Sequence, residues 1–294
     1  HQYRRVEPIV PSPAQVERAA DMLAAAALPM IHAGSGIIHA GAYDELRRVS
    51  EILHAPVTTS WAARGVLPET CETSIPMPYM KLNHEVRNDS DLVLVVGSRL
   101  GETDWWGKAP YWRRPSEQQM IQVDVDGHVL GSNKPAALTA LADAKLFLAA
   151  LADALVARTG RMNLDARRRK VAKYRDTARA ERAKLDEKLT DMAVPMNTGH
   201  VAHTCQQVFP EGSVLVADGG NTAVWAMMFH QMRVPNTILS TFKFGMLGAG
   251  AAQALGAAVA RPETPVCCII GAGAMGFHPQ EVETAVRNHL RVVY

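Results

Sequence analysis

The segment CCIIGAGAMGFHPQEVETAVRN, residues 267–288, joins an apolar strand pattern to a glycine-rich turn and then to an amphipathic helix pattern. Strand, turn and helix in this order are typical of an α/β unit. Gly271, Gly273 and Gly276 also match G-x-G-x-x-G, the spacing of dinucleotide-binding turns, where glycines let the backbone approach a pyrophosphate. The segment therefore predicts a phosphate-binding turn, and a nicotinamide or flavin cofactor is the first hypothesis to test.

Pro279 argues against a dinucleotide. In a Rossmann unit the helix begins within the glycine motif, but here Pro279 follows soon after Gly273. A proline inside a helix removes a backbone hydrogen bond and clashes with a carbonyl, at a cost of about 3 kcal/mol, whereas the first turn tolerates it. We therefore expect the helix to start at about His278–Pro279 and GAGAMGF, residues 271–277, to form a long loop. A nicotinamide-dependent oxidoreductase remains the less favoured alternative.

Two more strand–turn–helix patterns precede this one. SVLVADGGNTAVWAMM, residues 213–228, reads as a strand, an acidic glycine turn and a helix. In STFKFGMLGAGAAQALGAAVA, residues 240–260, a glycine-rich turn leads into a helix of small residues. Ligands of open parallel sheets bind at the carboxyl ends of the strands, so each of the three turns is a candidate ligand contact.

The first half of the chain alternates amphipathic helix patterns with near-continuous apolar strands, which predicts a parallel sheet covered on both faces. The helix patterns cover residues 13–27, 42–55 and about 143–158, and the strand patterns cover 29–36, 55–60, 91–99 and 119–127. We expect an α/β protein of two domains with parallel sheets flanked by helices, the second domain incomplete. The predicted boundaries are a linker at 1–12, a first domain at 13–158, a connecting segment at 159–194 and a second domain at 195–294.

The connecting segment is highly charged and has the pattern of a helix. Its four consecutive basic residues, 167–170, could bind an anion. Acidic residues follow them at Asp176, Glu181, Asp186 and Glu187, so a solvated connecting helix is the preferred interpretation.

Composition describes an ordinary globular chain. The 294 residues are 48% hydrophobic and 20% charged, and the net charge of +2 gives no electrostatic reason to expect nucleic acid. The four cysteines form no C-x-x-C pair, no apolar run reaches about 18 residues, and we find no signal-peptide pattern. We therefore expect a cytoplasmic protein without a membrane partner. The chain lacks an initial methionine and ends on a strand pattern, so we expect an internal piece of a longer polypeptide or a truncated product.

Taken in order, the motifs resemble the thiamine-diphosphate enzymes of the acetolactate synthase type, a group that includes benzaldehyde lyase and oxalyl-CoA decarboxylase. In the first domain, the resemblance rests on PMIHAGSGI, APVTTSWAARGVLPE, DLVLVVGSRL and MIQVDVDG. In the second, it rests on ADGGNTAVWA, FGMLGAGAAQALGAAVARPE and GAGAMGFHPQEVETAVRN. It implies a Rossmann-like middle domain of the six-strand type, followed by the N-terminal part of the diphosphate-binding domain. The implied reaction is formation or cleavage of a C–C bond on a 2-oxo acid, by a carboligase or decarboxylase.

The resemblance also assigns roles to residues at the three turns. It places the diphosphate and its Mg²⁺ against Gly220, Asn221 and Thr222 and against the loop of Gly271, Ala272, Gly273 and Ala274. The carbonyl of Gly245 would accept a hydrogen bond from the aminopyrimidine group. Leu247 would be the apolar wedge that bends the cofactor. The implied substrate is a 2-oxo acid or acyl compound, and the implied assembly is a homodimer or homotetramer.

Ala272 departs from the family pattern. The family's metal loop reads G-D-G, whereas this chain reads Gly271-Ala272-Gly273. Mg²⁺ prefers oxygen ligands, and a methyl group offers none, so the sequence predicts an impaired metal site and no metal-ligating side chain here. The glutamate that protonates the pyrimidine belongs to a first domain that this sequence lacks. A non-catalytic homologue, acting as a scaffold or binding subunit, is therefore the alternative function.

The middle domain has two further candidate features. In some relatives this domain binds FAD or ADP, near positions equivalent to Gly34, Ser35 and Arg99. Four aromatic residues after GSRLGETD could stack on a nucleotide, shape a substrate channel or pack a long loop against a neighbouring subunit: Trp105, Trp106, Tyr111 and Trp112.

Overall fold

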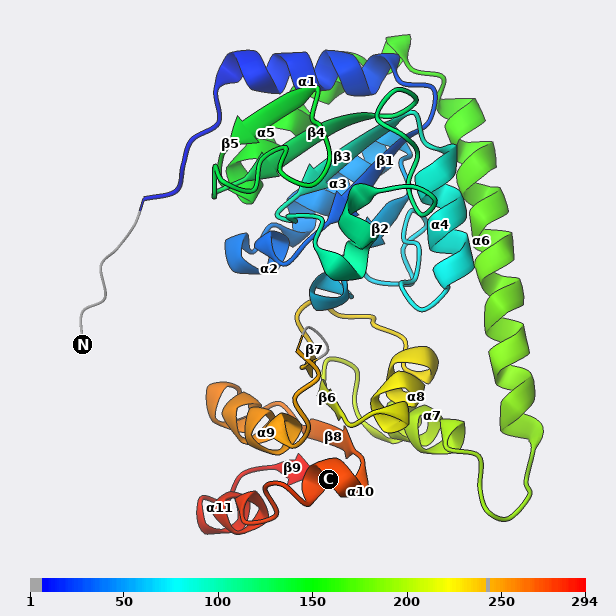
Figure 1. Cartoon of the computed structure of the whole chain (residues 1–294), viewed down its shortest axis with the longest axis vertical. Helices are drawn as coiled ribbons and strands as arrows, with labels where there is room; N and C mark the ends of the chain where they lie inside the picture. Colours follow the sequence, from blue (N-terminus) through cyan, green and yellow to red (C-terminus); the bar gives the residue numbers. More distant parts are fainter. Residues whose placement is uncertain (1–6, 242–243) are drawn as a thin grey trace. The chain divides into compact units, whose positions relative to one another are not determined.

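The computed structural model describes residues 7–241 and 244–294. The chain divides into two compact units (Figure 1). The first contains the chain up to Leu67 together with Cys71–Ala178, and the second contains Pro68–Thr70 together with Arg179–Tyr294. The two-domain α/β prediction is confirmed.

The first unit is built on a parallel sheet with strand order β2-β1-β3-β4-β5. Among the described residues five strands form it, where the resemblance implied a six-strand type, and a parallel bridge from Val57 to Ser74 extends the β2 edge. The sequence patterns had indicated four of the strands but not β5. Because the order reverses between β1 and β3, the ligand-binding switch point of this sheet lies at their carboxyl ends. The strands are β1 (Pro29–Ala33), β2 (Val57–Thr59), β3 (Leu92–Val96), β4 (Gln119–Asp124) and β5 (Leu138–Leu141).

Alternating side chains of β3 explain why both faces of this sheet are covered. Leu92, Leu94 and Val96 join the core beneath one helical layer, whereas Val93 and Val95 join a second core on the other face. The first layer contains α1 (Pro13–Ala25), α2 (Gly36–Ala40), α3 (Tyr43–Leu53) and α5 (Ala144–Val156), and the second contains α4 (Met80–Asp89) and the first half of α6 (Leu164–Glu187). Short 3₁₀ turns complete the unit at Trp61–Ala63, Glu102–Gly107 and Thr159–Arg161.

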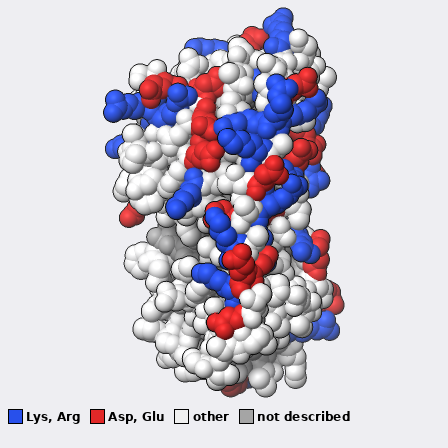
Figure 2. Space-filling model, turned by 90° about the vertical axis from the view of Figure 1, so that its right-hand side faces the viewer, with Lys and Arg blue, Asp and Glu red and all other residues white. Residues whose placement is uncertain are grey.

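Helix α6 matches the predicted connecting helix, and its charges are mixed on the face shown in Figure 2. Arg167 is the exception to the solvated interpretation, because its side chain is buried. Its guanidinium donates hydrogen bonds to the carbonyls of Leu23, Ala24 and Ala26 near the end of α1 and to that of Leu53 at the end of α3. Arg167 therefore satisfies helix-terminal carbonyls that have no partner within their own helices.

The second unit contains a parallel sheet of order β7-β6-β8-β9. Its order reverses at β6 and β8, so the switch point lies at the carboxyl ends of these two strands. Small residues of α9 (Ala249–Ala260) pack closely on the sheet, with Ala254, Ala257 and Ala258 against Val216 and Cys268. The strands are β6 (Val214–Asp218), β7 (Ile238–Ser240), β8 (Val266–Ile270) and β9 (Val292–Val293), and the other helices are α7 (Gly199–Val208), α8 (Asn221–Phe229), α10 (Ala272–Met275) and α11 (Glu281–Arg287), with a 3₁₀ turn at Lys188–Thr190.

The GAGAMGF segment is not the open loop that the sequence predicted. Residues Ala272–Met275 form the one-turn helix α10, which opens with a bond from the Met275 amide to the Gly271 carbonyl. The argument from Pro279 nevertheless holds in its main point, because α10 ends before Pro279. A separate helix, α11, begins just after it, with Gln280 as its N-cap. The long helix that a dinucleotide fold would start at these glycines does not form.

In the part of the chain that the structure describes, no helix combines the length and apolarity needed to cross a bilayer.

Candidate functional site

The first and third glycine turns meet at the switch point of the second sheet. Gly219 follows β6 with a φ of +102°, and a Cβ built on it would lie 3.2 Å from the amide nitrogen of Gly271. Gly271 follows β8, and its amide donates to the carbonyl of Asp218 over 3.2 Å. A Cβ on Gly271 would lie 3.1 Å from Oγ1 of Thr222. Gly219 thus favours glycine through its positive φ and the close Gly271 backbone, whereas at Gly271 a side chain would press on the Thr222 hydroxyl.

The amino end of α8 opens onto this junction. Gly220 is its N-cap, and Gly220 and Asn221 are exposed. The first amides of a helix have no partner within it and carry the positive end of the helix dipole. Together with the hydroxyl of Thr222, they form a site suited to an anion such as a diphosphate. The structure thus brings together the predicted diphosphate residues of the first and third turns.

The second turn is tied to the third through Gly248. This residue has a φ of +90°, and a Cβ on it would lie 2.7 Å from Cβ of Phe277 and 3.0 Å from the carbonyl oxygen of Ala274. The predicted cofactor residues Gly245 and Leu247 lie just before it. Gly245 has a φ of +70° and Leu247 is 42% exposed. Both therefore lie on an open loop next to the site.

The residues present do not fit Mg²⁺. Ala272 and Gly273 are exposed but offer no side-chain oxygen. The carboxylate of Asp218 is close in the chain, but its two oxygens already accept hydrogen bonds from the amides of Gly219 and Gly250. No group of three His, Cys, Asp or Glu side chains with metal-binding geometry occurs among the described residues.

The first unit contains a buried ionic cluster that sequence patterns did not reveal. Asp104 lies 3.3 Å from Nε2 of His32 and 3.7 Å from the guanidinium of Arg87, and its carbonyl accepts from the Trp112 indole over 2.8 Å. Burial raises the pKa of Asp104. The opposing effects of His32, Arg87 and a hydrogen bond from Ser98 are larger, so the net pKa lies below its usual value. Burial also lowers the pKa of Arg87 to about 10. The cluster anchors the loop that follows β3.

The predicted middle-domain nucleotide residues lie beside that loop. A Cβ on Gly34 would lie 2.1 Å from the carbonyl oxygen of Gly97, so the β1 and β3 turns are in direct backbone contact. Ser35 is half-buried and Arg99 is exposed.

Three of the four aromatic residues in that loop pack within the first unit. Trp112 is completely buried, and Trp105 stacks on Tyr111 with ring centroids 4.0 Å apart. Trp106 is 43% exposed. Trp105, Tyr111 and Trp112 therefore pack the loop within its own unit. Packing of the loop against a neighbouring subunit, one of the three interpretations offered from sequence, stays a prediction.

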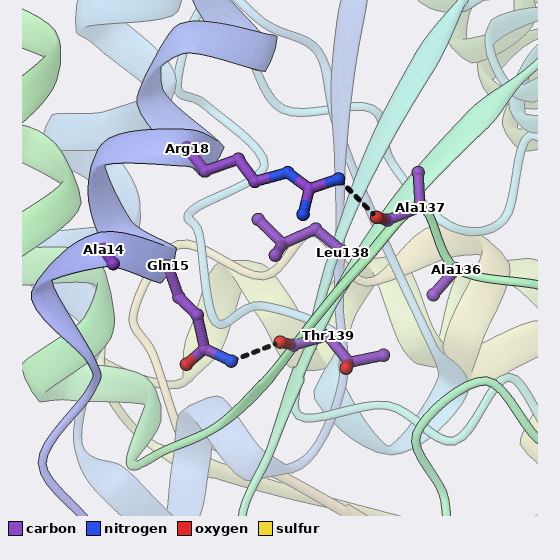
Figure 3. Close-up of a pocket in the computed structure, with 7 residues that line it drawn as sticks. All are labelled: Ala14, Gln15, Arg18, Ala136, Ala137, Leu138 and Thr139. Atoms are coloured by element: carbon purple, nitrogen blue, oxygen red, sulfur yellow. Dashed lines mark hydrogen bonds between the residues drawn. The ribbon is translucent and has the colours of Figure 1, made fainter.

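A separate groove of about 390 Å³ lies along the β5 edge of the first sheet (Figure 3). Gln15 donates to the carbonyl of Thr139 over 2.9 Å, and Arg18 donates to the carbonyl of Ala137 over 3.3 Å. Side chains of α1 therefore bind one carbonyl of this edge strand and one just before it, and covering an edge in this way hinders its pairing with another strand. The groove contains none of the residues predicted from sequence.

Comparison with known proteins agrees with the motifs. Residues 16–151 match the central domain of thiamine pyrophosphate enzymes, and residues 218–294 match their C-terminal TPP-binding domain. The chain belongs to the thiamine pyrophosphate enzyme family. Its central-domain and TPP-binding-domain matches come in the order predicted from the motifs.

Similar proteins carry several activities. The chain is 27% identical over 291 residues to a probable acetolactate synthase large subunit of Methanocaldococcus jannaschii, covering 96% of this chain and 47% of that protein. It is 30% identical over 279 residues to a probable 2-ketoarginine decarboxylase of Pseudomonas aeruginosa, covering 94% and 46%. It is 29% identical over 295 residues to a 2-hydroxyacyl-CoA lyase of Arabidopsis thaliana, covering 99% and 50%. The chain thus spans about half the length of these relatives.

A solved structure shares the fold. It is that of a putative thiamin diphosphate-dependent enzyme from Mycobacterium smegmatis, with a TM-score of 0.74 at 20% sequence identity. The match covers 99% of this chain and 54% of that one. At this identity the likeness supports the arrangement of helices and sheets rather than any activity.

Proposed function

We propose that this chain supplies the diphosphate-binding turns of a thiamine-diphosphate-dependent enzyme that forms or cleaves C–C bonds of 2-oxo acids, as an acetolactate synthase-like carboligase or decarboxylase. The observation that supports it most is the junction of the Gly219 and Gly271 turns in front of the exposed amino end of α8. The amides there suit an anion, and the family is defined by a cofactor that carries a diphosphate.

Each predicted residue has a role in this proposal. Amides of Gly220 and Asn221 and the hydroxyl of Thr222 hold one side of the diphosphate, and the α10 turn, residues 271–274, holds the other. The carbonyl of Gly245 accepts a hydrogen bond from the amino group of the pyrimidine, and Leu247 packs against the rings of the cofactor. When bound, thiamine diphosphate supplies a carbon nucleophile and an electron sink for chemistry at a carbonyl. The protein's part is to fix the geometry and exclude water.

A metal ion plays no part in the roles assigned above, because Ala272 offers it no oxygen. The same observation favours a second candidate function, a homologue that binds the cofactor or a partner without turnover. By family, we propose a 2-oxo acid or acyl substrate and a homodimer or homotetramer for the active form. FAD or ADP binding near Gly34, Ser35 and Arg99 remains a lesser proposal for the first unit.

Calorimetric titration of the full-length polypeptide with thiamine diphosphate tests the assignment. The unsubstituted protein and the variants Ala272→Asp and Ala272→Asn are each titrated with Mg²⁺ and with EDTA. We expect the unsubstituted protein to bind with the same Kd in both conditions. Ala272→Asp should bind at least about tenfold more tightly with Mg²⁺, a gain of about 1.4 kcal/mol, because it adds a carboxylate ligand. Ala272→Asn is the size-matched control without the charge.

The outcomes separate the hypotheses. No binding by any form would refute the cofactor assignment, and micromolar binding of NADH would restore the dinucleotide interpretation. Turnover of a 2-oxo acid by the unsubstituted protein supports the enzyme. Cofactor binding without turnover, together with turnover by Ala272→Asp, supports the non-catalytic homologue.

A further inference from the structure

One residue of the second unit forms hydrogen bonds to all three turns. Oδ1 of Asp218 accepts from the amide of Gly219 over 2.6 Å, and Oδ2 accepts from the amide of Gly250 over 2.7 Å. Its backbone carbonyl accepts from the amide of Gly271 over 3.2 Å. We propose that Asp218 is the positioning residue that fixes the three glycine turns relative to one another and so shapes the cofactor site.

The packing around Asp218 fits this role. Asp218 is the last residue of β6, the strand at the switch point, and is only 2% exposed. Gly250 lies so close that a Cβ on it would be 2.5 Å from Cβ of Asp218. Position 250 must therefore lack a side chain for the carboxylate to reach its amide. On the other side, Sγ of Cys268 lies 3.7 Å from the carbonyl oxygen of Gly250, so both backbone polar groups of Gly250 have contacts.

The chemistry of these bonds requires a carboxylate. An ionised carboxylate accepts with both oxygens, whereas an amide of the same shape accepts with one and presents N–H groups with the other. Asn at position 218 would therefore place a donor against a donor at Gly219 or Gly250. The neighbouring thiol adds no competing charge, because burial and the Asp218 carboxylate raise the pKa of Cys268 to about 12.

Asp218 also directs where a phosphate can bind. Its Oδ2 accepts a hydrogen bond from the amide of Gly250 in the first turn of α9, so a negative charge already lies at the amino end of that helix. A second anion at the same end would be repelled. At α8 the carboxylate accepts only from Gly219, the residue before the N-cap, and no side chain caps the first amides of α8 among the described residues. This consequence rests on the proposed function, because it assumes that the anion is the diphosphate.

Hydrogen exchange of the cofactor-free, full-length protein tests the turns without any ligand. In Asp218→Asn, amide exchange should accelerate at least about tenfold at Gly219, Gly250 and Gly271 together. The matched control is Thr237→Val, which removes another buried hydrogen bond of this unit, from Oγ1 to the carbonyl of Val234 before β7. It should leave the three turns unchanged. Acceleration at Gly250 alone, or equally throughout the unit, would overturn the proposal.

A measurement on the unsubstituted protein keeps the proposal falsifiable if Asp218→Asn does not fold. With residue-level resolution, the amides of Gly219, Gly250 and Gly271 should show similar protection, greater than that of the exposed Gly220 and Gly273. Exchange of the Gly219 or Gly250 amide at the rate of an unstructured peptide would contradict the hydrogen bonds on which the proposal stands.

Calorimetry with thiamine diphosphate then links the turns to the cofactor. Asp218→Asn should raise the Kd at least about tenfold, and Thr237→Val should not change it. If the unsubstituted protein does not bind thiamine diphosphate but the three amides still exchange together, the proposed function fails and the tethering role of Asp218 stands. An unchanged Kd in a folded Asp218→Asn protein would overturn the positioning role and leave the cofactor assignment intact.

Discussion

Replacing Arg167 by Met should destabilise the first unit strongly, although the residue lies in a helix rich in exposed charges. Its guanidinium donates to four carbonyl oxygens, three near the end of α1 and one at the end of α3. Methionine keeps much of the side-chain length but donates nothing. Each buried acceptor left without a partner costs at least about 1 kcal/mol. Four such losses, partly offset because a charge is no longer buried, predict a net loss of about 3 kcal/mol.

Thermal unfolding followed by tryptophan fluorescence measures this loss. Four of the five tryptophans belong to the first unit, so the signal reports mainly on it: Trp61, Trp105, Trp106 and Trp112, with Trp225 in the second. For a unit of this size, about 3 kcal/mol corresponds to a fall in Tm of about 6–12 °C. Arg169→Met is the matched control, because Arg169 is exposed on the same helix and its loss should cost less than about 0.5 kcal/mol.

Arg167→Lys distinguishes charge from geometry. Lysine keeps the positive charge but cannot present the planar fork of donors, so its Tm should lie between those of the unsubstituted protein and Arg167→Met. The reasoning is refuted if Arg167→Met lowers the Tm no more than Arg169→Met does. That result would mean that water or backbone adjustment satisfies the helix-end carbonyls as well as the guanidinium does.

Three further outcomes follow from the contacts described. Gly34→Ala should lower the Tm measurably, because its Cβ would lie 2.1 Å from the carbonyl oxygen of Gly97, whereas Gly160→Ala, in open space, should not. Burial raises the pKa of Asp89, but hydrogen bonds from Lys170 and Tyr174 lower it by more, so the net pKa is below its usual value. The stabilisation from Asp89 is therefore present above about pH 4 and is lost as the pH falls through the lowered pKa. Asp89→Asn should flatten the acid limb of a curve of stability against pH. The Cys268 thiol, with its pKa raised to about 12, should resist alkylation at pH 8 in the folded protein, as judged by mass spectrometry of peptides.

The strand and helix patterns predicted most of the fold because each element buries one clear face. β5 was missed because only two of its four residues are buried, so its sequence Leu138–Leu141 has no continuous apolar run. The α10 turn was missed for a different reason. A one-turn helix has too few residues for any periodicity, and the glycines around it favoured a loop. Short elements held by tertiary contacts are the ones that sequence periodicity cannot show.

Sequence also predicted only some of the residues of the candidate site. The glycines were predictable because tight turns favour them, as at Gly219, where φ is positive and the Gly271 backbone lies close. The partners of buried polar groups were not, because Asp104 and Arg87 come from segments distant in sequence and only folding brings them together. Arg167 was misread for a related reason, since a basic residue in a charged helix has the same local pattern whether it is solvated or buried.

The role of Asp218 could not be predicted from its local sequence, although the residue itself stands in a recognisable pattern. An aspartate at the end of an apolar strand and before two glycines was visible in ADGG, but its role depends on Gly250, at the start of α9, and on Gly271, in the third turn. A single turn therefore specifies a backbone shape, whereas the site is specified by the bonds between turns. The G-x-G-x-x-G match at residues 271–276 illustrates the difference, because it says nothing of its partners. The contacts to Asp218 and Thr222 place it at the junction of three turns, and that junction, rather than the spacing of the glycines, argues for a diphosphate.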